Sequence, residues 1–223
     1  MLLRLRVSLP DRPGALGRVT RTLGAIGADI LQMTVLEREA GRALDEFTVQ
    51  WGGTLPHDRM AAGLETIQGV RVESIWTTSA PPGAFADLDV LGHVAANPAR
   101  AAVTLADAAP GIFSADWAAL ARSDATREIV HATWQAPTPL PPPAFVPMRP
   151  RAFTDGDGVH FAAAPLGGSG QVLLVARAAG PEFHRAEVLR LTLLTEVAMA
   201  MLGDGPVQPG WISPPAGEST SPV

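Results

Sequence analysis

In the first eighty residues, the alternation of apolar and polar side chains predicts four β-strands and two helices. Leu3, Leu5 and Val7 alternate with Arg4 and Arg6, which is the period-two pattern of a half-buried strand. In residues 14–26 and 57–68, apolar residues instead recur every three or four positions, as on the buried face of an amphipathic helix. The predicted strands are 2–9, 29–38, 43–51 and 70–76, and the predicted helices are 14–26 and 57–68.

This order of elements predicts an α+β fold with a ferredoxin-like split sheet. A βαββαβ chain places both helices on one face of an antiparallel sheet. The other face of that sheet is left without helices. Because an uncovered sheet is usually buried by a partner, often a second copy of the chain, we expect a homodimer.

A tight turn that carries proline and glycine joins the first predicted strand to the first helix. Its residues read Asp11-Arg12-Pro13-Gly14. Glycine allows close approach of the backbone, and proline has no N–H group to leave unpaired at a helix start. The free N–H groups of residues 14–17 and the positive end of the helix dipole attract an anion, such as a ligand carboxylate. In a purely structural alternative, Asp11 caps the helix and Gly14 only turns the chain.

The segment LPDRPGALGRVTRTLGAIGADI, residues 9–30, resembles the signature of the ACT domain, a small module that binds amino acids. The resemblance covers about residues 2–77 and implies the same βαββαβ order. Members of this family bind an amino acid at a dimer interface, using the first turn and the start of the second strand. In this chain those positions are Asp11, Arg12, Pro13, Gly14, Ala15, Leu16, Ala28, Asp29, Ile30 and Leu31.

One of these positions departs from the family pattern. Many members that bind amino acids carry asparagine at the start of the second strand, and this chain carries Asp29. An ionised aspartate only accepts hydrogen bonds, whereas asparagine both donates and accepts. Asp29 therefore either faces the ammonium group of a ligand, or indicates a site that binds something else or nothing.

The second half of the chain is separated from the first by a linker, for which we take residues 78–86. This segment contains Pro81, Pro82 and Gly83, which are typical of a domain boundary. Helical spacing then recurs over 87–108, with an interruption at Pro98. Further elements are predicted as strands at 116–122, 127–134, 159–166 and 171–178, a helix at 182–202, and a disordered tail at 204–223.

Two unusual segments in the second half have ordinary interpretations. Residues 136–150 contain seven prolines, which favours an extended surface loop over a peptide ligand of the PxxP type. The run from Gly167 to Gly170 joins two predicted strands and is interpreted as a hairpin turn, because no lysine or helix start follows as in a phosphate loop. Trp117 and Trp134 either line a pocket or belong to the core.

The segment GQVLLVARAAGPEFHRAEVLRLTLLTEVAMAML resembles the last third of a GAF-type sensory domain. The resemblance extends over about residues 85–203 and implies an antiparallel sheet flanked by helices. GAF domains often bind small molecules, and many dimerise through their first and last helices. No pocket residue can be carried over to this chain. The resulting division is an ACT-like domain at 1–77, the linker, a GAF-like domain at 87–203, and the tail.

Composition narrows the function classes further. The net charge is −5, without the basic excess that nucleic-acid binding needs. All seventeen basic residues are arginine and there is no cysteine, which excludes lysine Schiff bases and thiol catalysis. No apolar run is long enough for a membrane span, and the N-terminus lacks a signal-peptide pattern. We therefore expect a cytoplasmic protein with no nucleic-acid or membrane partner.

No catalytic or metal-binding constellation is evident. The five histidines are isolated in the sequence, and no nucleophile elbow, P-loop or dinucleotide fingerprint occurs. We expect no metal and no cofactor, and a non-catalytic regulatory protein that binds an amino acid or similar molecule at a dimer interface and signals to a protein partner. The main alternative is a scaffold protein with degenerate ligand sites. A third possibility is an enzyme whose active site lies in residues 85–203.

Overall fold

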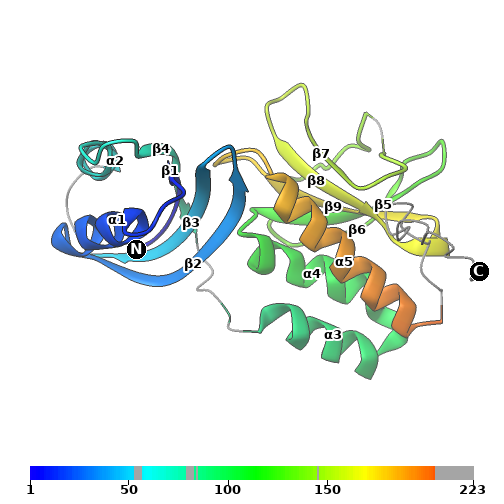
Figure 1. Cartoon of the computed structure of the whole chain (residues 1–223). Coiled ribbons are helices and arrows are strands. Elements are labelled where there is room, and N and C mark those ends of the chain that lie inside the picture. Colours follow the sequence, from blue (N-terminus) through cyan, green and yellow to red (C-terminus); the bar gives the residue numbers. More distant parts are fainter. Residues whose placement is uncertain (53–56, 79–82, 84, 145, 204–223) are drawn as a thin grey trace, which may run out of the picture.

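The first half of the chain is a four-stranded antiparallel sheet with two helices on one face (Figure 1). The structure is a computed structural model that describes residues 1–52, 57–78, 83, 85–144 and 146–203. The sheet order is β2-β3-β1-β4. The elements are β1 (Leu2–Pro10), α1 (Ala15–Ala25), β2 (Ala28–Glu39), β3 (Arg42–Trp51), α2 (His57–Glu65) and β4 (Arg71–Thr78).

This arrangement confirms the predicted α+β class and the βαββαβ order. The apolar positions of the strands and helices meet in one core, which includes Leu5, Val19, Leu23, Phe47 and Leu64. The helices cover only that face of the sheet. Most of the predicted linker and the whole predicted tail, 204–223, lie outside the described residues.

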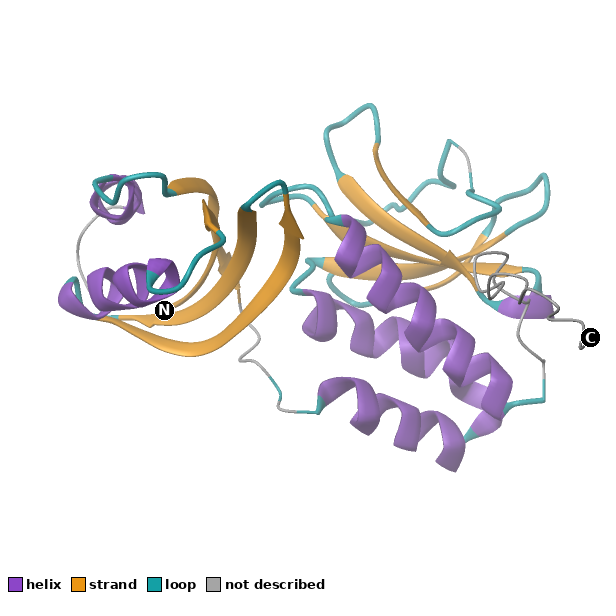
Figure 2. Cartoon of the chain, viewed as in Figure 1, coloured by secondary structure: helices purple, strands orange, loops and turns teal. Residues whose placement is uncertain are grey.

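The second half is a five-stranded antiparallel sheet with three α-helices on one face (Figure 2). Its strand order is β6-β5-β9-β8-β7. Its elements are α3 (Ala86–Ala96), η1 (Pro98–Arg100), α4 (Ala101–Phe113), β5 (Trp117–Arg122), β6 (Ile129–Ala132), β7 (Arg151–Thr154), β8 (His160–Pro165), η2 (Gly167–Ser169), β9 (Gln171–Arg177) and α5 (Arg185–Met201).

Several predicted elements of the second half differ from the observed ones, and three of the differences have a clear physical reason. Strand β7 was not predicted, because four residues after a proline-rich segment are too few to show an alternation. Strand β6 is shorter than the predicted 127–134, and Arg127 has a φ of 51°, outside the strand region. Helix α5 starts at Arg185 rather than 182, because His184 is its N-cap with extended backbone.

The proline-rich segment covers the face of the second sheet that the helices leave open. Its Leu140 and Val146 pack on that face, where Trp117 and Phe161 meet edge to face with ring centroids 5.6 Å apart. Trp117 is therefore a core residue. Trp134 is 89% exposed, so it does not line a pocket. The predicted hairpin turn at Gly167–Gly170 does join β8 to β9.

The two halves meet where the open face of the first sheet contacts the N-terminal end of α5 (Figure 1). On that face, Trp76 packs beside Gly180, where a Cβ atom would lie 3.1 Å from the indole Cδ1. We expected a second copy of the chain to cover this face, and the chain's own second half covers part of it instead. The uncovered part of this face is therefore smaller than we expected, and the homodimer remains a prediction.

Among the helices in the described ranges, none combines the length and the apolar character that crossing a membrane requires.

Candidate functional site

The β1–α1 turn presents unpaired backbone N–H groups at an exposed helix N-terminus. Gly14 is the N-cap of α1, with a φ of 81°, which favours glycine. The Ala15 N–H donates to the Arg12 carbonyl at 3.2 Å, and the Arg18 N–H donates to the Gly14 carbonyl at 3.3 Å. Within the described residues, the N–H groups of Leu16 and Gly17 between them have no acceptor. The turn therefore has the donors that an anion needs.

Asp11 does not cap α1, so the structural alternative for this residue is wrong. No side-chain hydrogen bond caps the helix. The Asp11 carboxylate instead accepts two hydrogen bonds from Arg38 of β2, at 2.8 and 3.0 Å. The Arg38 side chain is 67% exposed, and an ion pair this exposed is weak.

The two predicted parts of the ligand site lie at opposite ends of the first sheet. The turn follows Pro10, which pairs with Arg42 at one end of β3. Asp29 pairs with Gln50 at the other end of β3. Helix α1 spans the distance between them, about 16 Å for its eleven residues. One chain therefore does not bring residues 11–16 and 28–31 together.

A buried carboxylate lies on the helix side of the sheet, near the turn. Asp45 of β3 is 3% exposed, and its Oδ1 has no hydrogen-bond partner within the described residues. Burial raises the pKa of Asp45, and the negative charge of Asp11 raises it further, while Arg38 acts in the opposite direction. This residue was not among the predicted site residues.

We expect Asp45→Asn to raise the free energy of unfolding by about 1–2 kcal/mol at neutral pH, because it removes an unpaired buried charge. The folded-state pKa of Asp45 lies above its unfolded value. The ionised group therefore destabilises the fold at high pH, and the wild type regains this stability as the pH falls through the folded-state pKa. Urea denaturation at about pH 7 and about pH 4 should show the advantage of the variant shrinking at the lower pH. The exposed Asp29→Asn is the control, and an equal gain there would contradict the expectation.

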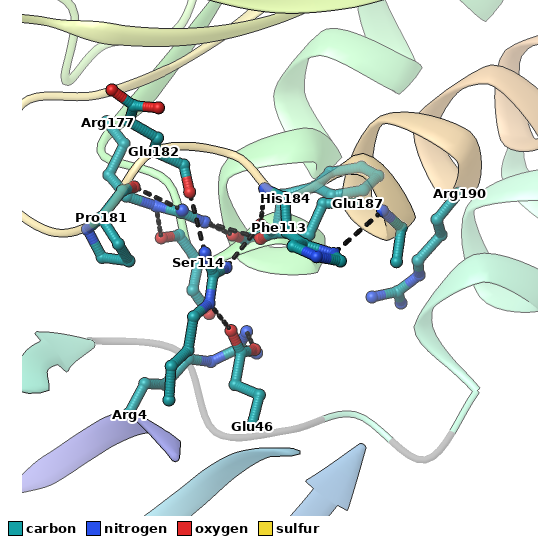
Figure 3. Close-up of polar contacts among 12 residues, drawn as sticks. Arg4, Glu46, Phe113, Ser114, Arg177, Pro181, Glu182, His184, Glu187 and Arg190 are labelled. Atoms are coloured by element: carbon teal, nitrogen blue, oxygen red, sulfur yellow. Dashed lines mark hydrogen bonds and ion pairs between the residues drawn. The ribbon is translucent and has the colours of Figure 1, made fainter. Parts of the chain in front are cut away.

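A cluster of buried charges joins the two halves (Figure 3). Arg6 of β1 donates to Glu46 of β3 at 2.8 Å and to Glu187 of α5 at 2.5 Å. Its third contact is the carbonyl oxygen of Glu182, at 2.8 Å. Arg4 donates to the other oxygen of Glu46 at 2.6 Å. The guanidinium of Arg6 therefore connects the first sheet directly to the start of α5.

Arg177 at the end of β9 completes this cluster from the second half. It is 0% exposed and donates to the carbonyls of Phe113, Ser114 and Pro181 at 2.7, 3.3 and 3.0 Å. It also donates to Glu187 at 2.9 Å. Its guanidinium therefore holds the end of α4 and the segment before α5 in one arrangement.

Glu187 is the acidic centre of the cluster. Burial opposes its ionisation, but the adjacent charges of Arg177 and Arg6 outweigh that effect and lower the pKa of Glu187. Its carboxylate also accepts a hydrogen bond from the His184 backbone N–H at 2.8 Å, which is one half of a capping box. The same side chain therefore starts α5 and binds the first sheet.

A second contact between the halves runs along the end of β2. Glu37 pairs with His184, Nε2 to Oε2 at 2.8 Å, and with Arg185. The His184 Nδ1 accepts a hydrogen bond from the Ala186 N–H, so the network assigns the proton to Nε2. A cleft of about 640 Å³ beside this contact is lined by Arg42, Glu73 and other residues of both halves. The two halves are therefore joined here by the charged contacts of Glu37, which border an open cleft.

No protein-family model matches the chain, and no curated protein matches it. The solved structures with partial similarity include the following two. A formyltetrahydrofolate deformylase from Pseudomonas putida KT2440 matches with 18% identity over 42% of this chain and 37% of that chain, with a TM-score of 0.31. An unknown protein from Galdieria sulphuraria matches with 11% identity over 91% of this chain and 93% of that chain, also with a TM-score of 0.31. The first match spans well under half of the deformylase, and neither similarity carries an inference about function.

Proposed function

We propose that the protein is a non-catalytic regulator that binds an amino acid or a similar small carboxylate at the β1–α1 turn of a homodimer and signals to a protein partner. The observation that carries the proposal is the exposed α1 N-terminus, where Leu16 and Gly17 have free N–H groups and Gly14 leaves the approach open. Helix N-termini of this kind bind carboxylates. The resemblance of residues 9–30 to the ACT signature supports the same site.

A homodimer through β2 accounts for the separation of the two parts of the site. Strand β2 is an edge strand of twelve residues, and it exposes Leu31, Met33 and Val35. Two copies of an edge strand that pair antiparallel about a two-fold axis place the start of one beside the end of the other. The turn at Asp11 lies at the end of β2, where it contacts Arg38. Asp29 of one copy would thus approach the turn of the other.

Strand β2 also links the turn to the second half, because two neighbouring residues of this strand contact one part each. Arg38 binds Asp11 on the helix side of the sheet, and the neighbouring Glu37 binds His184 on the opposite face. Successive residues of a strand point to opposite faces, so both contacts depend on one short stretch of backbone. A ligand that displaces Arg38 would therefore disturb the contact with α5.

We expect at least one of the twenty amino acids, at millimolar concentration, to raise the melting temperature of the full chain, because a ligand at 100 times its Kd stabilises the bound state by about 2.7 kcal/mol. Gly14→Asn should abolish the shift. Asparagine tolerates positive φ, and its side chain competes for the free N–H groups. Differential scanning fluorimetry is the measurement.

Gly158→Asn is the matched control for that variant. Gly158 lies between β7 and β8 of the second half with a φ of 82°, and a Cβ atom there meets nothing within 4 Å, as at Gly14. This variant should respond to the ligand like the wild type. If no amino acid shifts the wild type, or if Gly14→Asn responds normally, the proposed function is wrong.

The second candidate is a scaffold protein that has lost its ligand. It is favoured by one observation, which is that Asp11 is engaged by Arg38 rather than free in the turn. For such a protein, the Gly14→Asn variant keeps its protein partner, and no amino acid alters the melting temperature.

A further inference from the structure

A small pocket lies between the open face of the first sheet and the helices of the second half. Its volume is about 100 Å³, and it is lined by residues of β1, β2 and β3 on one side and of α4 and α5 on the other. Because liquid water occupies about 30 Å³ per molecule, the pocket has room for a few waters or for one small ion. It shares no lining residue with the larger cleft beside Glu37.

Arg4 lines this pocket with an unused hydrogen-bonding edge. The residue is 9% exposed, and its Nη1 donates to Glu46. Its Nε has no acceptor among the described residues, and neither has its Nη2. Nε and Nη2 form the side-on edge of a guanidinium, which can donate two parallel hydrogen bonds to one oxyanion. Arg4 therefore offers a free two-point donor at the pocket.

Two further donors lie beside Arg4 across the sheet. Arg4 pairs with Thr48 of β3, and Thr48 pairs with Gln32 of β2. Paired residues of antiparallel strands carry their side chains on the same face, with Cβ atoms about 4.5–5.5 Å apart. Neither the Thr48 hydroxyl nor the Gln32 amide forms a hydrogen bond within the described ranges. The sheet side of the pocket is therefore a row of three side chains with unused donors.

The buried charges around the pocket carry one positive charge in excess. Three guanidinium groups surround two carboxylates, and the five residues are Arg4, Arg6, Arg177, Glu46 and Glu187. All four carboxylate oxygens already accept hydrogen bonds from these arginines. The neighbouring Arg190 is paired with Asp87 and adds no net charge. Burial lowers the pKa of Arg4, although Glu46 acts in the opposite direction. A small anion beside Arg4 would therefore balance the cluster.

We propose that this pocket binds one small inorganic oxyanion, phosphate or sulfate, between the side-on edge of Arg4 and the donors of Thr48 and Gln32. Arg190 of α5 lines the same pocket from the second half (Figure 3). The bound anion would thus contact the first sheet and α5 together and stabilise the docked arrangement of the two halves. The site lies apart from the β1–α1 turn, and the inference does not depend on the proposed function.

The test measures the melting temperature of the full chain in sodium phosphate, sulfate or chloride up to about 10 mM at constant ionic strength, because a ligand that binds only the folded state raises it with concentration. Phosphate and sulfate should raise the melting temperature, and chloride should not, because one spherical ion cannot accept both hydrogen bonds of the guanidinium edge in parallel. An equal effect of chloride, or no effect of any salt, would overturn the proposal. Phenyl phosphate is too large for the pocket, and a response equal to that of phosphate would exclude the free ion as the ligand.

Thr48→Val keeps the shape of the side chain and removes its hydroxyl. Isothermal titration calorimetry should show phosphate binding at least about tenfold more weakly, because a hydrogen bond to a charged group is lost. Arg4→Gln should abolish binding. Thr77→Val, an exposed change on β4 outside the pocket, is the matched control and should bind like the wild type.

Gly14→Asn separates this pocket from the β1–α1 turn, where an anion could also bind. This variant should keep the full response to phosphate. If it loses the response while Thr48→Val keeps it, the anion binds at the turn and the proposed pocket site is wrong. If Thr48→Val and Arg4→Gln both respond like the wild type, the effect of phosphate is a general salt effect and the inference fails, whether or not the turn binds an amino acid.

Discussion

Replacing Glu187 with glutamine is expected to lower the free energy of unfolding by about 3–5 kcal/mol, because removing one partner leaves other buried charges uncompensated. Glu187 binds both Arg6 and Arg177 and accepts the His184 N–H at the start of α5. A glutamine amide presents its own N–H donors to at least one of these guanidinium groups. Urea denaturation of the full chain at neutral pH measures the loss.

Glu196→Gln is the control for this change. Glu196 lies on the same helix and forms no ion pair within the described residues, so we expect a change of at most about 0.5 kcal/mol. The pKa of Glu187 is lowered in the folded state, so its contribution is present above the unfolded pKa and is lost as the pH falls through the folded-state value. Wild type and variant should therefore converge in acid. A constant difference at all pH values would show that the charge of Glu187 is not the cause.

Arg177→Met is the second large loss that we expect, again about 3–5 kcal/mol. Methionine fills much of the same volume, but it leaves the carbonyls of Phe113 and Pro181 without their buried donor. It also removes the guanidinium that lies 4.1 Å from the centre of the Phe183 ring. The result would be loosening of the segment that holds α5 against the first sheet.

Arg122→Met is the control, which distinguishes the loss of the buried contacts of Arg177 from the loss of any arginine side chain. Arg122 pairs with Asp124 at 2.6 Å, but its side chain is half exposed, so we expect a loss of at most about 1 kcal/mol. The double variant Arg177→Met/Glu187→Gln should cost less than the two single changes together, because the groups share one contact. If the two losses simply add, Arg177 and Glu187 act separately and the description of a single cluster is wrong.

Periodicity was enough to predict the first half of the fold. The alternation in 2–9 and 43–51 placed β1 and β3 within one residue of their observed bounds, because strands with one buried face carry their register in the sequence. Helix α5 was predicted three residues too long at its start. Histidine is not a common N-cap, so His184 gave no local sign that the helix begins after it.

The candidate site was predictable only in part. Gly14 and its turn were found because a strand, a Pro-Gly turn and a helix follow one another in the sequence. The burial of Asp45 could have been predicted, because Asp45 lies two residues before Phe47 and therefore on the same face of β3 as its apolar residues. Arg177 gave no such signal, because it ends a strand like any surface arginine and two of the carbonyls that it binds, those of Phe113 and Ser114, are 64 and 63 residues away.

The contacts of Glu37 and Arg38 mean that the β1–α1 turn and the docking of the two halves cannot be modified independently. Glu37 contacts His184 at the start of α5, and the next residue, Arg38, contacts Asp11 of the turn. A substitution of Arg38 that alters the turn would also alter the geometry at His184, and a loosened interface would alter the turn. Divergence or engineering of either region therefore has to include the end of β2 as a unit.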